Sequence, residues 1–238
     1  MKKVLFLLGA FIFFDRPMDA AVNQGEYQYL DAIALKAGSD KGSTFHNYTE
    51  LYSEYFAPLK EKPIKFLEIG IYKGSSVKMW EEYFKNADLH FMDITYKYVE
   101  YHSKRSHYYL CDQGNAAELN QFIQKAGGGF DVILDDGGHS MPQQITSFKT
   151  LFPHVKSGGM YIIEDLHTSY WNSYGGNGPD STVNFLKSLI DEVNFVGART
   201  ERANHRNLPS SIRGELNIYR ESIESMHFYD SVVIIKKR

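Results

Sequence analysis

The chain has 238 residues, of which 43% are hydrophobic and 23% charged, a composition typical of a folded globular protein and not of a disordered or low-complexity one. Its 26 basic and 29 acidic side chains give a net charge of -3, and no segment is basic enough to neutralise a run of phosphates, which argues against a nucleic-acid partner. The single cysteine, Cys111, excludes an internal disulfide and a cysteine-based metal site.

The N-terminal residues have two readings. Residues 4–14 form an apolar run after two lysines, which is typical of a secretory signal, but charged residues stand where small ones are expected before a cleavage site. We therefore treat residues 1–23 as a signal peptide or a packed segment, and residues 24–238 as a single domain. No run reaches the roughly 18 apolar residues of a membrane helix, so no stable membrane span is predicted. Residues 24–59 have a helical pattern with one glycine-rich loop.

From residue 64 onward, short apolar runs alternate with helical patterns. Residues 64–71 predict a strand that ends in a glycine turn, and residues 75–84 predict a helix. The same unit recurs, with strands at 89–94, 108–111, 130–134 and 160–163 and helices at 116–126 and 143–152. Residues 222–229 and 231–236 predict a closing antiparallel hairpin. We expect an α/β fold with a Rossmann-like, doubly wound, mostly parallel seven-stranded sheet and a C-terminal antiparallel hairpin.

The turn after the first of these strands can bring a ligand close to the backbone. Its glycines, Gly70 and Gly74, are four apart and lack the G-x-G-x-x-G spacing of dinucleotide sites, which disfavours a nicotinamide enzyme. Glu68 precedes them as a hydrogen-bond acceptor. Asp93 ends the next strand, where a carboxylate can accept hydrogen bonds from the two hydroxyls of a ribose.

A nucleoside site also needs groups that recognise the base. Asp112 and Gln113 end the third strand, and a carboxylate beside an amide suits the amine and ring edge of adenine. For Asp112 alone, a turn or helix cap is the simpler reading. The presence of Asp93 on the neighbouring strand favours the nucleoside reading.

The strongest feature is a set of carboxylates at the ends of two successive strands. Asp135 and Asp136 follow the fourth strand, and Glu164 and Asp165 follow the fifth. Because adjacent strands lie about 4.8 Å apart, these acids repel one another unless a cation joins them or one takes a proton. Oxygen ligands of this kind suit Mg²⁺, or Mn²⁺ by the same logic, and the sequence does not decide between Glu164 and Asp165 as ligands. The alternative is a set of solvated strand ends and helix caps.

His139 follows Asp136 by three residues, within reach of a group bound to the same ion. A metal-bound hydroxyl has a lowered pKa and histidine titrates near neutrality, so we assign catalytic roles to His139 and Asp136. A turn hydrogen bond is the simpler reading of a lone histidine. Residues 166–176 are polar and aromatic, and they predict either a surface on which sugar rings stack or a lid packed on the core.

On these residues the chain resembles the class I S-adenosylmethionine-dependent methyltransferases, most closely the magnesium-dependent macrolide sugar O-methyltransferases and cephalosporin-hydroxylase-like proteins. The resemblance rests on residues 39–42 with His46 and Tyr48, and on residues 66–70, 135–139, 163–165 and 168–171. It implies that the metal is held by Asp136, Glu164 and Asp165 and that His139 is the base. The cofactor would be held by Lys41, Glu68, Gly70, Gly74, Ser75, Asp93, Asp112, Gln113 and Asp135.

We therefore expect a methyltransferase that uses S-adenosyl-L-methionine and Mg²⁺ to methylate a hydroxyl of a sugar or glycosylated small molecule. The alternatives are a metal-dependent hydroxylase-like enzyme, a catechol-type methyltransferase and a non-catalytic cofactor-binding protein. Non-haem iron normally takes two histidines with one carboxylate, which argues against the hydroxylase. The cofactor favours a cytoplasmic location, while the signal-like segment leaves export open. The sequence also leaves open a homo-oligomer.

Overall fold

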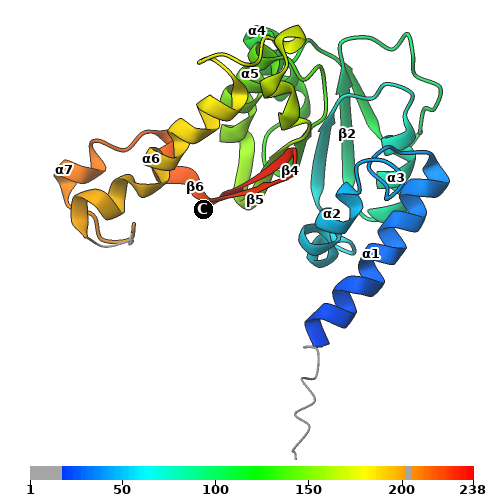
Figure 1. The fold of residues 1–238 in the computed structure, drawn as a ribbon, viewed down its shortest axis with the longest axis horizontal. Coiled ribbons are helices and arrows are strands. Elements are labelled where there is room, and N and C mark those ends of the chain that lie inside the picture. The colour runs from blue at the N-terminus through cyan, green and yellow to red at the C-terminus, as the bar shows by residue number, and fades with distance from the viewer. Residues whose placement is uncertain (1–17, 202–204) are drawn as a thin grey trace, which may run out of the picture.

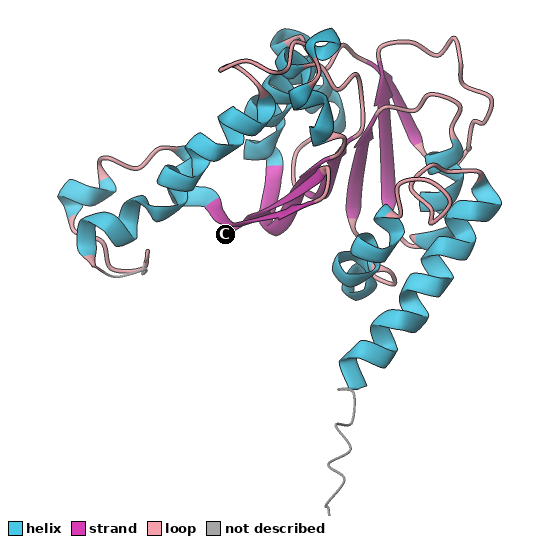
Figure 2. Cartoon of the chain, in the orientation of Figure 1, coloured by secondary structure: helices cyan, strands magenta, loops and turns pink. Residues whose placement is uncertain are grey.

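A computed structural model describes residues 18–201 and 205–238. The candidate signal sequence falls largely on residues 1–17, which lie outside the described residues. Seven strands form one sheet, in the order β3-β2-β1-β4-β5-β7-β6 (Figures 1 and 2). They are β1 (Lys65–Ile69), β2 (Asp88–Asp93), β3 (His107–Leu110), β4 (Phe130–Asp135), β5 (Val155–Ile163), β6 (Ile223–Tyr229) and β7 (Val232–Lys237).

Strands β1 to β5 pair in parallel, while β7 runs antiparallel to both β5 and β6. The predicted sheet with its C-terminal antiparallel hairpin is confirmed. The order of the strands places β1 and β4 side by side at the centre of the sheet. The turns that follow these two strands therefore meet at one edge, where ligands of open α/β sheets bind.

Helices cover both faces of this sheet. They are α1 (Met18–Ala37), α2 (Tyr48–Phe56), α3 (Ser75–Tyr83), α4 (Ala116–Ala126), α5 (Met141–Leu151), α6 (Thr182–Thr200), α7 (Ser210–Arg213) and α8 (Ile218–Ser222), with short 3-10 turns at Ala57–Leu59, Phe152–His154, Leu166–Tyr170 and Asn172–Tyr174. In Figure 1, α1 to α3 lie on one side of the sheet, and α4 to α6 lie on the other. The two faces bury separate apolar clusters.

Alternation along β1 shows how the two clusters arise. Phe66 packs with the residues of α1 to α3, whereas Leu67 and Ile69 pack with those of α4 to α6, because successive side chains of a strand point to opposite faces. Such strands are apolar throughout, as expected of a parallel sheet covered on both sides. Glu68 interrupts the apolar run, since it is completely buried on the face of Phe66.

Helix α6 was not predicted, and it follows the segment after β5. Its buried residues, Leu186, Leu189 and Val196, pack into the cluster of α4 and α5 or stand at its border, and its outer end projects beyond the sheet with α7 (Figure 1). Ser181 caps its first turn by accepting a hydrogen bond from the amide of Asn184. Within the described residues, none of the helices combines the length and the apolar character needed to cross a bilayer.

Candidate active site

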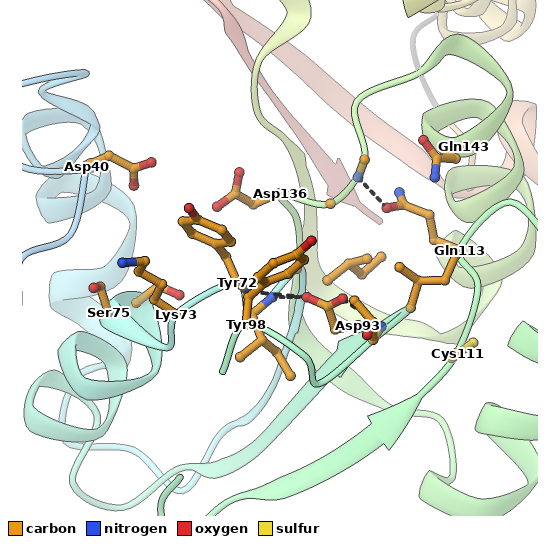
Figure 3. Close-up of a pocket in the computed structure, with 18 of the residues that line it drawn as sticks. Asp40, Tyr72, Lys73, Ser75, Asp93, Tyr98, Cys111, Gln113, Asp136 and Gln143 are labelled. Atoms are coloured by element: carbon orange, nitrogen blue, oxygen red, sulfur yellow. Dashed lines mark hydrogen bonds between the residues drawn. The ribbon is translucent and has the colours of Figure 1, made fainter. Parts of the chain in front are cut away.

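A cavity of about 460 Å³ opens at the carboxyl ends of β1, β2 and β4 (Figure 3). This volume is in the range of small-molecule sites. Four of the predicted cofactor residues line it, namely Gly70, Ser75, Asp93 and Gln113, and the predicted catalytic Asp136 lines it as well. The cavity therefore joins the two ends of the site that the sequence predicted separately.

Gly70 allows the turn after β1 to contact the turn after β4. Its φ is +97°, and a Cβ placed there would stand 2.0 Å from the carbonyl oxygen of Asp136. The amide of Asp136 in turn donates to the carbonyl of Ile69 at 2.9 Å. Only glycine fits this conformation and this close approach, so the absence of a side chain at Gly70 sets the shape of the cavity wall.

Asp93 holds the same turn from the other side. Its Oδ2 accepts hydrogen bonds from the amides of Ile71 at 2.8 Å and Tyr72 at 3.2 Å, and its Oδ1 accepts one from Thr95 at 3.0 Å. Oδ2 thus accepts two amides, while Oδ1 accepts one and keeps a lone pair for a further donor. The exposed rings of Tyr72 and Tyr98 lie 6.1 Å apart beside this carboxylate (Figure 3). Neither tyrosine was singled out from the sequence, because their approach depends on the β2–β3 connection.

The other predicted cofactor residues are not among those that line the cavity, and their role in cofactor binding stays a prediction. Gly74, with φ +87°, begins α3 and packs against Tyr101. Asp112 accepts a hydrogen bond from the amide of Gly114 at 2.8 Å, so the simpler turn reading holds for its side chain. Lys41, Glu68 and Asp135 are buried, and their contacts are with other protein groups.

Asp135 supports the turn that carries Asp136. It is fully buried and accepts hydrogen bonds from Gln113 at 2.8 Å, from Tyr161 at 3.2 Å and from Ser147. Burial raises the pKa of Asp135 above its usual value. The carbonyl oxygen of the Gln113 side chain accepts from the amide of Gly138 at 2.8 Å. This network fixes the turn in one position, which is a structural role.

Asp136, His139 and Asp165 form the candidate metal centre. One ligand atom from each lies within 4.8 Å of the others, and His139 Nε2 stands 3.5 Å from Asp165 Oδ2 and 3.9 Å from Asp136 Oδ1. Both His139 and Asp165 have φ of 56°, an uncommon conformation that is found at functional sites. His139 Nδ1 is buried and has no hydrogen-bond partner among the described residues. The two carboxylates fit a divalent cation as oxygen ligands, with the imidazole of His139 beside them.

Glu164, the third predicted ligand, turns to Lys41 and Tyr52. Lys41 is 1% exposed, and its Nζ lies 2.6 Å from Glu164 Oε2 and 3.7 Å from Glu68 Oε1. Lys41 also forms an ion pair with Asp136 Oδ2. Tyr52 donates a hydrogen bond to the other oxygen of Glu164. The ammonium of Lys41 is thus a cation that joins the acids at the ends of β4 and β5.

The charges in this cluster shift one another's pKa values. Burial lowers the pKa of an isolated lysine, but Asp136, Glu164 and Glu68 surround Lys41 and hold its pKa well above the usual range. Burial raises the pKa of Glu68 to about 7, against the opposing effect of Lys41. We conclude that Lys41 is charged at neutral pH. Asp136 directs Oδ2 to this ammonium and Oδ1 toward His139, so one carboxylate serves both groups.

A run of aromatic rings, here called the aromatic rim, extends outward from Asp165. Tyr48 donates a hydrogen bond to Asp165 at 2.9 Å, and its ring stacks on His46 at 4.8 Å between centroids. His46 lies 6.5 Å from His167, which contacts Trp171 at 4.6 Å. The sequence pattern indicates an aromatic segment around Trp171, but it does not show that His46 lies beside this segment. That link depends on α2 packing beside the end of β5, which sequence spacing does not show.

The chain is similar to characterised sugar O-methyltransferases. It is 32% identical over 229 residues to the 8-demethyl-8-alpha-L-rhamnosyl tetracenomycin-C 2'-O-methyltransferase of Streptomyces olivaceus, in a match covering 92% of this chain and 57% of that protein. It is 35% identical over 198 residues to the L-olivosyl-oleandolide 3-O-methyltransferase of Streptomyces antibioticus, covering 75% of this chain and 50% of that protein. The chain spans about half the length of the curated relatives it matches. No known protein-family profile matches it.

Solved structures agree with these sequence matches. The MycE methyltransferase of the mycinamycin biosynthetic pathway, in complex with Mg and SAH, superposes with a TM-score of 0.73 at 28% identity, over 87% of this chain and 54% of that one. Its complex with Mg, SAH and mycinamycin VI gives 0.72 at 26% identity, over 95% and 64% of the two chains. The chain is therefore related in sequence and structure to the macrolide and tetracenomycin sugar O-methyltransferases, and it has the fold of the class I S-adenosylmethionine-dependent methyltransferases.

Proposed function

We propose that this protein transfers the methyl group of S-adenosyl-L-methionine to a hydroxyl of a sugar on a glycosylated small molecule, with the help of Mg²⁺. The observation that carries the proposal is the position of Asp136. It lines the cofactor-sized cavity and also belongs to the cluster with His139 and Asp165. A methyl donor in the cavity and an acceptor at the cluster are thus neighbours, as group transfer requires.

The cavity fits the donor by its chemistry. Asp93 lines the cavity and can accept a ribose hydroxyl, since its Oδ1 accepts only one hydrogen bond, from the amide of Thr95. Gln113 and Cys111 also line the cavity, to one side of Asp93 (Figure 3), where they could contact the base of a nucleoside. Gly70 lines the cavity as well, at the point where the turns after β1 and β4 meet. This supports a nucleoside-bearing donor, which the relatives solved with SAH also bind.

The cluster fits a divalent cation through Asp136 Oδ1 and Asp165 Oδ2, which face His139 from two strand ends. A bound Mg²⁺ would lower the pKa of an acceptor hydroxyl and fix its orientation. Because Lys41 balances Glu164, we assign the ligand role first to Asp136 and Asp165. Glu164 remains a prediction as a ligand.

His139 takes the proton from the acceptor in this proposal. Its Nε2 is the nitrogen that faces the two carboxylates, and their negative charge stabilises the imidazolium that forms. Thr168 holds the backbone of His139 by donating to its carbonyl oxygen at 3.0 Å. S-adenosyl-L-methionine, when bound in the cavity, would supply its methyl group to the deprotonated hydroxyl oxygen and leave as S-adenosyl-L-homocysteine with the electron pair of the broken sulfur–carbon bond.

The aromatic rim is the proposed acceptor surface. Trp171 is half exposed and stands next to His167, whose Nδ1 lies 4.0 Å from Asp165 Oδ1. Aromatic faces stack on the apolar faces of sugar rings, so a sugar on the rim would place a hydroxyl near Asp165. The relatives that methylate rhamnosyl and olivosyl groups support this class of acceptor. We also infer a cytoplasmic location, because the methyl donor is made and used there.

The proposal is tested by incubating the purified chain with S-adenosyl-L-methionine, Mg²⁺ and a panel of rhamnosylated and olivosylated polyketides, each paired with its aglycone. Mass spectrometry should show one added methyl group on a glycoside and none on its aglycone, and EDTA should abolish the reaction. Methylation of planar catechols but not of glycosides would show that the acceptor is a catechol and would contradict the proposed acceptor class. Calorimetric binding of the donor without turnover of any acceptor would instead favour a non-catalytic protein.

A further inference from the structure

A second group of metal-ligating side chains lies at the opposite end of the sheet. Asp88 begins β2, His90 follows two residues later, and His107 begins β3. Residues two apart on a strand share a face, and His90 pairs with His107 in the register of the parallel strands. The backbone therefore presents all three side chains on one face, at the amino ends of the strands. The candidate active site occupies the carboxyl ends.

The three side chains converge on one another. His90 Nε2 lies 3.0 Å from Asp88 Oδ2, and His107 Nε2 lies 3.2 Å from Asp88 Oδ1. The two imidazole rings are stacked with centroids 4.8 Å apart. One ligand atom from each residue lies within 4.8 Å of the others. A small displacement of each side chain would put all three atoms around a common point.

His90 has the surroundings of a metal-binding histidine. It is 4% exposed, and its ring packs between Tyr109 and the edge of Phe130. Its other nitrogen, Nδ1, lies 3.1 Å from the hydroxyl of Tyr109. That hydroxyl can accept a hydrogen bond from the Nδ1–H group when Nε2 binds a metal, because a tyrosine hydroxyl both donates and accepts. Such a partner orients the ring and sets its tautomer.

We propose that Asp88, His90 and His107 bind a zinc ion at the edge of the sheet. Two imidazoles and one carboxylate are ligands that Zn²⁺ prefers and Mg²⁺ does not. Asp88 and His107 are both more than half exposed, so water can complete the coordination. The ion would tie β3, an edge strand of the sheet, to β2. The connection between these strands carries Tyr98 and Thr95 of the cofactor cavity, and the ion would anchor the end of that connection at His107, where β3 begins.

The test is a zinc titration of the metal-free full-length chain in excess Mg²⁺, with Co²⁺ absorption as a second readout. The wild-type chain should bind one Zn²⁺ outside the active site, and Co²⁺ should give the visible bands of a low-coordinate site with nitrogen ligands. His107→Gln and Asp88→Asn change exposed residues and should abolish this binding. Tyr109→Phe should weaken it about tenfold or more, since it removes the partner of a ligand. Circular dichroism should show that each variant is folded.

Two control variants separate the outcomes. His102→Gln removes an exposed histidine of the β2–β3 connection whose ring contacts Tyr108, and this variant should bind zinc as the wild type does. Asp136→Asn alters the candidate active site and should also leave this zinc binding in place. Equal affinity in His107→Gln and wild type would overturn the proposal, and so would zinc binding lost only in Asp136→Asn. The result does not depend on methyltransferase activity.

Discussion

Lys41 Nζ lies 2.6 Å from Glu164 Oε2, and the two side chains are almost wholly buried. The same ammonium pairs with Asp136. Part of the repulsion among the acids at the ends of β4 and β5 is therefore relieved by a cation that the chain itself supplies. A metal ion would therefore bind on the outer side of the cluster, where Asp136 Oδ1, Asp165 and His139 face one another.

Replacing Lys41 tests this buried network. Lys41→Met should lower the free energy of unfolding by about 3 kcal/mol or more, because it leaves buried carboxylates without their counter-charge. Urea denaturation in EDTA measures the loss. Lys36→Met, at an exposed lysine that pairs with Glu82, is the matched control and should cost less than about 1 kcal/mol. Similar losses in the two variants would show that Lys41 is not a structural counter-ion.

The stability of the protein should depend on Glu68 between about pH 4.5 and pH 7. Burial raises the pKa of this carboxyl from 4.5 to about 7 in the folded chain, so the folded state keeps a proton that the unfolded state loses. The contribution is present below pH 4.5 and lost as the pH rises to 7, on the order of 3 kcal/mol at about 1.4 kcal/mol per pKa unit. Urea unfolding across this range should show Glu68→Gln gaining stability relative to wild type as the pH rises. If the stabilities of the two proteins changed in parallel with pH, the raised pKa of Glu68 would be contradicted.

Adding a methyl group at Gly70 should disrupt the contact between the turns after β1 and β4. A Cβ there would stand 2.0 Å from a backbone oxygen at a φ of +97°, so Gly70→Ala should cost about 3 kcal/mol of unfolding free energy and weaken donor binding. Gly197→Ala is the control. Its Cβ would meet no atom of the described residues within 4 Å, and in the helix α6 it should stabilise by about 0.5–1 kcal/mol. Equal effects of the two changes would contradict the close approach.

Removing the base should separate chemistry from binding. His139→Ala should lower kcat about 10²- to 10⁴-fold, because general base catalysis contributes that much. His139 stands outside the cavity lining, so calorimetry should show donor affinity unchanged. If the variant kept a normal kcat, or lost its affinity for the donor, the role of His139 as the general base would be contradicted.

Much of the fold could be predicted from the sequence, because alternating apolar runs and turn residues report local structure. The five parallel strands, the terminal hairpin and helix α4 follow directly from such patterns. Helix α6 was missed. Only a few of the residues of α6 are buried, so its apolar pattern is weak. The segment before it has the composition of a loop. Which residues of such a helix are buried depends on the elements that pack against it, and the local sequence does not show this.

The site was predicted less completely for the same reason. Gly70 and Asp93 stand at strand ends, so their position in the cavity follows from topology alone. The sequence places Lys41 near the cofactor, but its buried position between Glu164 and Asp136 depends on how the loop after α1 crosses the sheet. Likewise, only the register of β2 and β3 shows that His90 and His107 lie side by side. Distances between distant segments are set by packing, which one sequence does not report.

The central claim is that the cavity and the Asp136 cluster form one methyl-transfer site. The most direct test is an anomalous-scattering map of crystals grown with Mn²⁺ and S-adenosyl-L-homocysteine. We predict a manganese peak at bonding distance from Asp136 and Asp165, with the nucleoside in the cavity between Gly70 and Asp93. A map with the nucleoside elsewhere, or with manganese bound away from both carboxylates, would contradict the account.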